Sequence, residues 1–243
     1  MIYRLQYACI KHSPPLNSLL KLLYSKCSFA MQHPFTQGRQ SINTKHSWAT
    51  INEYLLVLNL APAMEEKVMQ VKQAFANTYD HPPAAFSKPH ITLVSFSQIA
   101  LAEQNIVQQL QRYIQQHPPV TIATEGFGSF PTHTIYCKVT SNNSIVPLVK
   151  HLRGMQRLLT LDKLNKPHFI TTPHITIARK LQAWQYEQGW KAYVHQPFTA
   201  RCITDQVVLL RRNAFQKNYT SVQIFQLAGI AQKNTATQTQ LFG

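Results

Sequence analysis

The feature that most constrains this chain is a tetrapeptide, Pro-His-Ile-Thr, that occurs at 89–92 and again at 173–176. Each copy leads into an apolar run. The proline disfavours helical angles in the residue before it, so a strand is expected to begin at each copy. Because side chains at i and i+2 share one face of a strand, the histidine and the threonine of each copy should lie side by side.

The order of elements around the two copies is also repeated. Each copy is preceded by a strand, a helix and a proline-bearing loop, and is followed by a helix. Short α/β units resemble one another by default, so the repeated histidines are what favours two related lobes. The predicted elements are strands over 51–60 and 134–140 and helices over 61–79, 101–116, 144–159 and 181–194.

Three further strands are predicted. One covers 120–127 and is joined to the strand over 134–140 by a turn that contains Gly128 and Pro131; two more, over 198–213 and 218–228, close the fold. Ser144 is expected to cap the helix that it begins, because a serine there can accept a hydrogen bond from free backbone amides. His168 lies in a similar stretch, KPHFITT, but has isoleucine where threonine should follow, and is interpreted as a loop residue.

Residues 51–230 are predicted to form a single bilobal domain. Residues 1–50 contain six Lys or Arg and no Asp or Glu, and we expect them to be a disordered basic extension. A mitochondrial transit peptide, a flexible basic arm, and upstream sequence preceding a true start at Met31 all remain open. Residues 231–243 are expected to form a flexible tail.

Charge favours a polyanionic partner, because 24 Lys and Arg oppose 9 Asp and Glu for a formal net charge of +15. The four cysteines form no C-x-x-C pair, which fits a reducing compartment, and we expect a cytoplasmic protein. The longest apolar runs are far shorter than the roughly 20 residues of a membrane helix. The sequence contains no H-x-x-x-H motif, no glycine-rich phosphate loop and no G-x-S-x-G elbow, so neither a metal nor a cofactor is expected.

The repeated motif suits proton transfer at a phosphate. If the lobes pack side by side, His90 and His174 line one cleft, and imidazoles titrate near neutrality, so one can accept a proton while the other donates one. Hydroxyls such as those of Thr92 and Thr176 suit phosphate oxygens. Arg179 would add a fixed cation, but its odd offset from His174 requires a bulge or a strand end to turn it toward the cleft.

Other candidates are weaker on the sequence alone. Lys88 could touch a phosphate at the cleft edge, and Arg211 and Arg212 could follow an RNA backbone, yet solvated loop and hairpin ends account for all three equally well or better. Aromatic residues could stack on a base, although aromatic residues in β structure usually belong to the core. The aromatic candidates are Phe96, Phe130 and Tyr136.

These residues resemble the 2H phosphoesterases, and within them the RNA 2′,3′-cyclic phosphodiesterases historically called 2′-5′ RNA ligases. The resemblance is carried by two His-x-Thr-x motifs, His90–Leu93 and His174–Ile177, by the H-I-T-I-A-R segment that ends at Arg179, and by the order of strands and helices. It covers roughly residues 53–227. Residues 1–50 match nothing in that family.

The resemblance implies an α+β, bilobal fold in which two antiparallel sheets with pseudo-twofold symmetry surround a central cleft, with helices on the outside. It implies metal-independent opening of 2′,3′-cyclic phosphate ends of RNA or small nucleotides to 2′-phosphates. We also expect the protein to be a monomer. His174 would then assist the water and His90 the leaving oxygen. Thr92, Thr176 and Arg179 would bind the substrate.

Two alternatives remain open at this point. The protein could be a non-catalytic RNA-binding or phosphate-binding module that keeps the cleft as a phosphate cradle. It could also be a phosphodiesterase for 2′-5′ linked oligonucleotides or for an ADP-ribose cyclic phosphate, because the motifs specify the phosphate and not the rest of the ligand.

Overall fold

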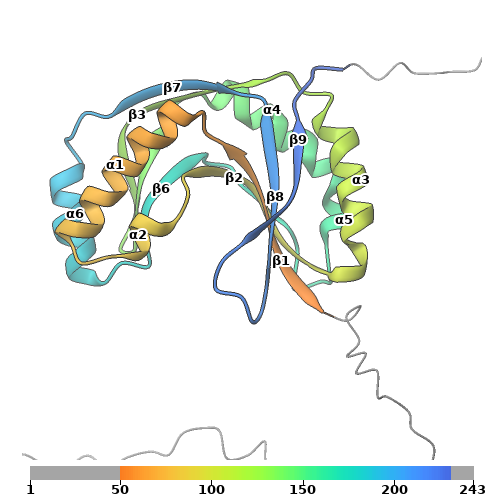
Figure 1. Ribbon diagram of the computed structural model, residues 1–243, viewed down its shortest axis with the longest axis horizontal. Coiled ribbons are helices and arrows are strands. Elements are labelled where there is room, and N and C mark those ends of the chain that lie inside the picture. Colours follow the sequence, from red (N-terminus) through yellow and green to blue (C-terminus); the bar gives the residue numbers. More distant parts are fainter. Residues whose placement is uncertain (1–49, 231–243) are drawn as a thin grey trace, which may run out of the picture. The chain divides into compact units, whose positions relative to one another are not determined.

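The computed structural model describes residues 50–230, and Figure 1 shows how their helices and strands are arranged. The predicted basic extension, up to residue 49, and the predicted tail over 231–243 lie outside the described residues. The strands are β1 (Ile51–Asn59), β2 (His90–Ile99), β3 (Val120–Phe130), β4 (Thr134–Val139), β5 (His168–Phe169), β6 (His174–Arg179), β7 (Thr199–Thr204), β8 (Gln206–Asn213) and β9 (Thr220–Gln226). The helices are α1 (Pro62–Thr78), α2 (Pro83–Phe86), η2 (Ala100–Ala102), α3 (Glu103–Ile114), α4 (Asn142–Leu152), η3 (Arg153–Met155), α5 (Gln156–Leu159) and α6 (Ala183–Tyr193).

All nine strands of this described part belong to one antiparallel sheet, in the order β7-β3-β4-β6-β2-β1-β8-β9, with β5 paired to β2. The expected two sheets are therefore the two halves of one sheet. They meet where Ile91 of β2 pairs with Ile175 of β6. The predicted α+β class is confirmed.

The two halves repeat one another about this junction. Reading outward, β2 and β6 are flanked by β1 and β4, then by β8 and β3, then by β9 and β7. Along the chain, β1-α1-β2-α3 matches β4-α4-β6-α6, as the sequence predicts. This order gives the described part of the chain its pseudo-twofold symmetry.

The helices cover the outer side of the curled sheet. Figure 1 shows α1, α2 and α6 grouped beside the half that contains β6, and α3 and α5 beside the other half. Although α1 joins β1 to β2, it packs against β6 and β7. The helix connecting two strands of one half thus covers the other half, which ties the halves together.

Buried and partly buried residues alternate along the central strands β2 and β6, so each strand has one face in the core and one face outside it. Ile91, Leu93, Ile175 and Ile177 are fully buried. The residues between them on both strands are only partly buried. Period-2 alternation of this kind places one face against the helices and leaves the other available for polar side chains.

Two predicted boundaries are wrong in β3 and α4. Strand β3 continues through Gly128 to Phe130, because a glycine at 128 leaves room for the ring of Tyr136 to cross it. Helix α4 begins at Asn142, so Ser144 lies inside it and is not its cap, and the chain continues through η3 and α5 instead of one long helix.

Two further expectations are corrected. The predicted strand over 198–213 is two strands, β7 and β8, divided at Asp205, because β7 pairs with β3 in one half and β8 pairs with β1 in the other. His168 is not a loop residue, since β5 pairs with β2. Among the helices of residues 50–230, none is both long enough and apolar enough to cross a lipid bilayer.

Candidate active site

The pairing of Ile91 with Ile175 brings the two motifs together. In an antiparallel pair with this register, His90 lies next to Thr176, and Thr92 lies next to His174. All four are partly buried and lie on the face opposite the helices. The two imidazoles therefore lie diagonally across the junction, with a threonine beside each.

The two imidazoles are held in the same way. Nδ1 of His90 lies 2.9 Å from the carbonyl oxygen of Lys88, and Nδ1 of His174 lies 2.9 Å from that of Thr172. A carbonyl can only accept, so Nδ1 must carry the proton in both rings. Each Nε2 is thereby left to accept a proton in the neutral ring or to donate one in the cation.

Both motif strands contain a β-bulge at the same position. On β2 the partners of Leu56 and Val57 are Val94 and Thr92, so Leu93 is the extra residue. On β6 the partners of Ile135 and Tyr136 are Ala178 and Thr176, so Ile177 is the extra residue. In both strands the extra residue directly follows the threonine of the motif.

The bulge in β6 decides where Arg179 lies. Because Ile177 is extra, Arg179 pairs with Thr134 while Thr176 pairs with Tyr136, and these two partners are on one face of β4. Arg179 therefore lies on the same face as Thr176. In a regular strand its odd offset from His174 would have placed it on the opposite face, and the bulge supplies the correction. Its counterpart on β2 is Ser95, so the two halves differ at this position in charge.

Burial lowers the pKa of both imidazoles, and neighbouring cations add to the shift at His90. Burial is the main cause that lowers the pKa of His90, and the charges of Lys72, Arg179 and His174 lower it further, against the bond to Lys88. Burial likewise lowers the pKa of His174, opposed by the bond to the Thr172 carbonyl. A bound phosphate would oppose these shifts, because an anion stabilises an imidazolium.

Aromatic rings pack beside His174. The ring centroid of Phe130 lies 4.9 Å from that of His174 in an edge-on arrangement, and that of Tyr136 lies 5.1 Å away. Phe96, by contrast, is buried and stacks on Tyr54, so it belongs to the core. The sequence raised Phe130 and Tyr136 as candidates, and the structure places both against a motif histidine.

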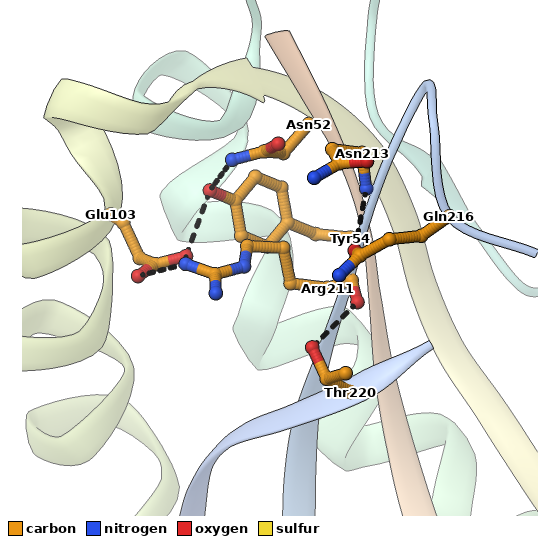
Figure 2. Close-up of polar contacts among 7 residues, drawn as sticks. All are labelled: Asn52, Tyr54, Glu103, Arg211, Asn213, Gln216 and Thr220. Carbon is orange, nitrogen blue, oxygen red and sulfur yellow. Dashed lines mark hydrogen bonds and ion pairs between the residues drawn. The ribbon is translucent and has the colours of Figure 1, made fainter. Parts of the chain in front are cut away.

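Three candidate cations pair with carboxylates instead. Lys88 Nζ lies 3.2 Å from a Glu65 oxygen. Arg211 turns toward Glu103 (Figure 2), and its Nη1 lies 3.0 and 3.1 Å from the two carboxylate oxygens. Glu103 also accepts a hydrogen bond from the Tyr54 hydroxyl.

Arg212 pairs with Glu53, and its guanidinium lies 4.7 Å from the centroid of the Tyr219 ring. Tyr219 also donates a hydrogen bond to Glu53 over 3.0 Å. Arg211 and Arg212 thus each pair with a carboxylate within the fold.

Sequence reasoning missed two residues near the junction. His168 pairs with Ser95 and therefore projects from the same face, as an exposed third imidazole at the edge of the site. Lys72 is 1% exposed beneath β6. No local signal marks either: β5 is only two residues long, and Lys72 occupies an ordinary position in an amphipathic helix.

Solved structures of similar fold include TT0787 of Thermus thermophilus, with a TM-score of 0.54 and 19% identity, covering 73% of this chain and 98% of that one. The crystal structure of E. coli LigT complexed with 3′-AMP gives a TM-score of 0.52 and 16% identity, with coverages of 73% and 98%. Likeness at these identities establishes the fold alone.

Relatives by sequence carry provisional phosphoesterase names. One from Geobacillus thermodenitrificans is 35% identical over 122 residues, 47% of this chain and 66% of the relative. Another from Bacillus pumilus is 29% identical over 119 residues, 48% of this chain and 66% of the relative. This chain thus spans just under two thirds of the length of these two relatives. A family model described as the 2′-5′ RNA ligase superfamily matches residues 61–214, a range that contains both motifs, and the chain belongs to that family.

Proposed function

We propose that this protein is a phosphodiesterase that opens 2′,3′-cyclic phosphate ends of RNA or of small nucleotides to 2′-phosphates. The observation that carries the proposal is the matched pair of imidazoles, each with Nδ1 bound to the carbonyl two residues before it and each with an Nε2 that bonds to no other residue of the described part of the chain. Two such groups on one face can supply both proton transfers of a hydrolysis, so the reaction needs no metal.

The reaction balances with one water. The water oxygen forms a bond to phosphorus while the bond from phosphorus to the 3′ oxygen breaks. One imidazole takes the proton that the water loses, and the other, as imidazolium, gives a proton to the 3′ oxygen. Following the resemblance, His174 would be the base and His90 the acid; cations that lower the pKa of His90 also make its imidazolium a stronger donor.

The remaining candidates would hold the phosphate. Thr92 and Thr176 lie beside the two imidazoles and can donate to non-bridging oxygens. Arg179 shares their face and can offset the negative charge that builds on phosphorus. The LigT structures complexed with 3′-AMP, with ATP and with NADP+ support a nucleotide ligand.

The test is hydrolysis of an oligonucleotide that ends in a 2′,3′-cyclic phosphate, followed by identification of the product. His90→Ala and His174→Ala should each lower turnover by about two orders of magnitude or more while circular dichroism stays native. His195→Ala is the matched control, because His195 is exposed and distant from the motifs in sequence. Activity should survive EDTA.

Full turnover in either motif variant would refute the two-histidine mechanism. Salt-sensitive binding of the oligonucleotide without any 2′-phosphate product between pH 5 and 8 would instead identify a binding module. Preference for 2′-5′ linked oligonucleotides or for an ADP-ribose cyclic phosphate would keep the chemistry and change the substrate.

A further inference from the structure

Lys72 is a buried cation directly beneath the second motif. Its side chain belongs to α1, is 1% exposed, and pairs with no carboxylate among the described residues. Burial lowers the pKa of Lys72 to about 8. Burying an ammonium without a carboxylate costs free energy, so a lysine at such a position calls for a specific structural or functional reason.

The ammonium has three acceptors, one for each of its protons. Lys72 Nζ donates to the Ser87 hydroxyl at 2.9 Å, to the Thr176 carbonyl at 3.1 Å and to the Ile177 carbonyl at 3.2 Å. Ser87 lies three residues before His90, and Thr176 belongs to the second motif. One side chain thus links the approach to the first motif with the body of the second.

The two carbonyls are consecutive, which is unusual for a single donor on a strand. In a regular strand successive carbonyls point to opposite sides, toward different neighbouring strands. Here Thr176 and Ile177 both point toward Lys72 because Ile177 is the extra residue of the bulge. The bulge therefore presents two consecutive acceptors to one donor, and Lys72 bonds to both.

The matching bulge on β2 is satisfied differently. There the carbonyl of the extra residue, Leu93, accepts a hydrogen bond from the backbone amide of Ile170 at 3.0 Å. That bulge turns Ser95 onto the face of the site, whereas the one held by Lys72 turns Arg179. The bulge that is held by a cationic donor, Lys72, is thus the one that places the cation Arg179 on the face of the site.

Resting on the proposed function, we propose that Lys72 is a positioning residue for this site. Its ammonium holds the bulge of β6 in the form that places Arg179 on the face of the two imidazoles, and fixes that bulge to the loop before His90. Lys72 does not reach the substrate. It acts through Arg179 and through the relative placement of the two motifs.

The charge of Lys72 also contributes to the field at the site. Burial is the main cause that lowers the pKa of His90 and of His81, and the charge of Lys72 lowers both further, while the charge of Arg179 opposes the ammonium itself. Cys137, on β4 beside the ammonium, has its pKa raised by burial to about 12 and is a neutral thiol near neutral pH. Removing the cation should therefore raise the pKa of His90.

The experiment is a double-mutant cycle on hydrolysis of a 2′,3′-cyclic nucleotide, with Lys72→Met, Arg179→Met and the double variant. Lys72→Met should lower kcat about tenfold or more with a smaller change in KM, because the loss concerns the transition state. If Lys72 acts through Arg179, the kcat of the double variant should be only slightly lower than that of Arg179→Met alone. Lys67→Met, at an exposed position of the same helix, is the matched control and should keep wild-type turnover.

A second measurement separates this inference from the proposed function. In NMR of the same proteins, Lys72→Met should raise the pKa of the His90 imidazole and speed amide exchange across 176–178, whether or not the protein turns the nucleotide over. If the wild-type protein does not hydrolyse the nucleotide, the proposed function is refuted. The NMR measurements would then still decide the role of Lys72. Unchanged exchange and an unchanged His90 pKa, or fully additive losses in the cycle, would overturn the inference.

Discussion

Ile91 of β2 lies opposite Ile175 of β6, and at this pair the two halves of the sheet meet. Both side chains are fully buried against the helices, so neither reaches the site. Their pairing nevertheless fixes the site, because the histidine and the threonine on either side of each isoleucine point to the opposite face. A slip of one residue in this register would move each imidazole away from its threonine neighbour.

The assignment of acid and base can be tested with a substrate whose 3′ leaving atom is sulfur. A thiolate leaves without protonation, so loss of the acid should no longer matter. We expect the turnover of His90→Ala to be about tenfold or more higher with the sulfur substrate than with the oxygen substrate, and the turnover of His174→Ala to stay low with both. Rescue of His174→Ala instead would reverse the assignment.

The lowered pKa of both imidazoles predicts the pH dependence of kcat/KM. Turnover needs one ring neutral and one protonated, and in the free enzyme both pKa values lie below the ordinary 6.5. As pH rises above these values the protonated ring is lost, so kcat/KM should peak below pH 6.5 and fall above it. The two pKa values read from this profile are apparent values of the coupled pair of imidazoles and are not assigned to either ring alone.

A bound phosphate raises the pKa of the acid, so kcat should peak at higher pH than kcat/KM. Initial rates from pH 4.5 to 8.5, below and above KM, check both profiles. A kcat/KM that stays constant up to pH 8 would contradict the expected order.

Arg179 and Ser95 occupy equivalent places after the two bulges but differ in charge. Arg179→Met should lower kcat/KM by about 10-fold to 100-fold, because a fixed cation near the transferring phosphorus is removed. Ser95→Ala, which removes no charge, should change it by less. Arg201→Met, exposed on β7, provides a control for the loss of one positive charge; an equal effect there would mean that only net charge matters.

Gly128 leaves room for the ring of Tyr136. A Cβ at position 128 would lie 2.5 Å from a ring carbon of Tyr136, closer than atoms pack. Gly128→Ala should therefore displace the ring from His174 and lower stability by about 1–3 kcal/mol. Urea unfolding measures the loss. Gly128→Ala combined with Tyr136→Ala should recover part of it, and failure to do so would mean that the ring is not the obstacle.

Arg211 is predicted to serve the fold and not nucleic-acid binding. Its guanidinium bridges to Glu103, but 40% of its side chain is exposed and solvent screens the pair. Arg211→Met should lower the free energy of unfolding by about 1 kcal/mol. The slope of log affinity for RNA against log salt should stay unchanged, because no phosphate contact is lost. A slope reduced by about one would show a phosphate contact after all.

The sequence alone determined the elements around the motifs and the face that each motif residue shares. The alternation of His90, Ile91 and Thr92 is local, because the period of a strand is set by its own backbone. The repeated element order and the repeated histidines favoured two related lobes, and the family resemblance implied their pseudo-twofold arrangement. The alternation, and the period of each helix and strand, depend on neighbours within a few residues along the chain.

Only the tertiary structure decided the bulges, the face of Arg179 and the pairing of His168. A bulge depends on the partners of a strand and on the groups that hold it, and these are distant in sequence: Lys72 and Thr176 are 104 residues apart. The division of 198–213 at Asp205 has the same origin, because its two parts pair with strands in different halves. Local pattern fixes which side chains share a face; contacts across the fold fix which faces meet.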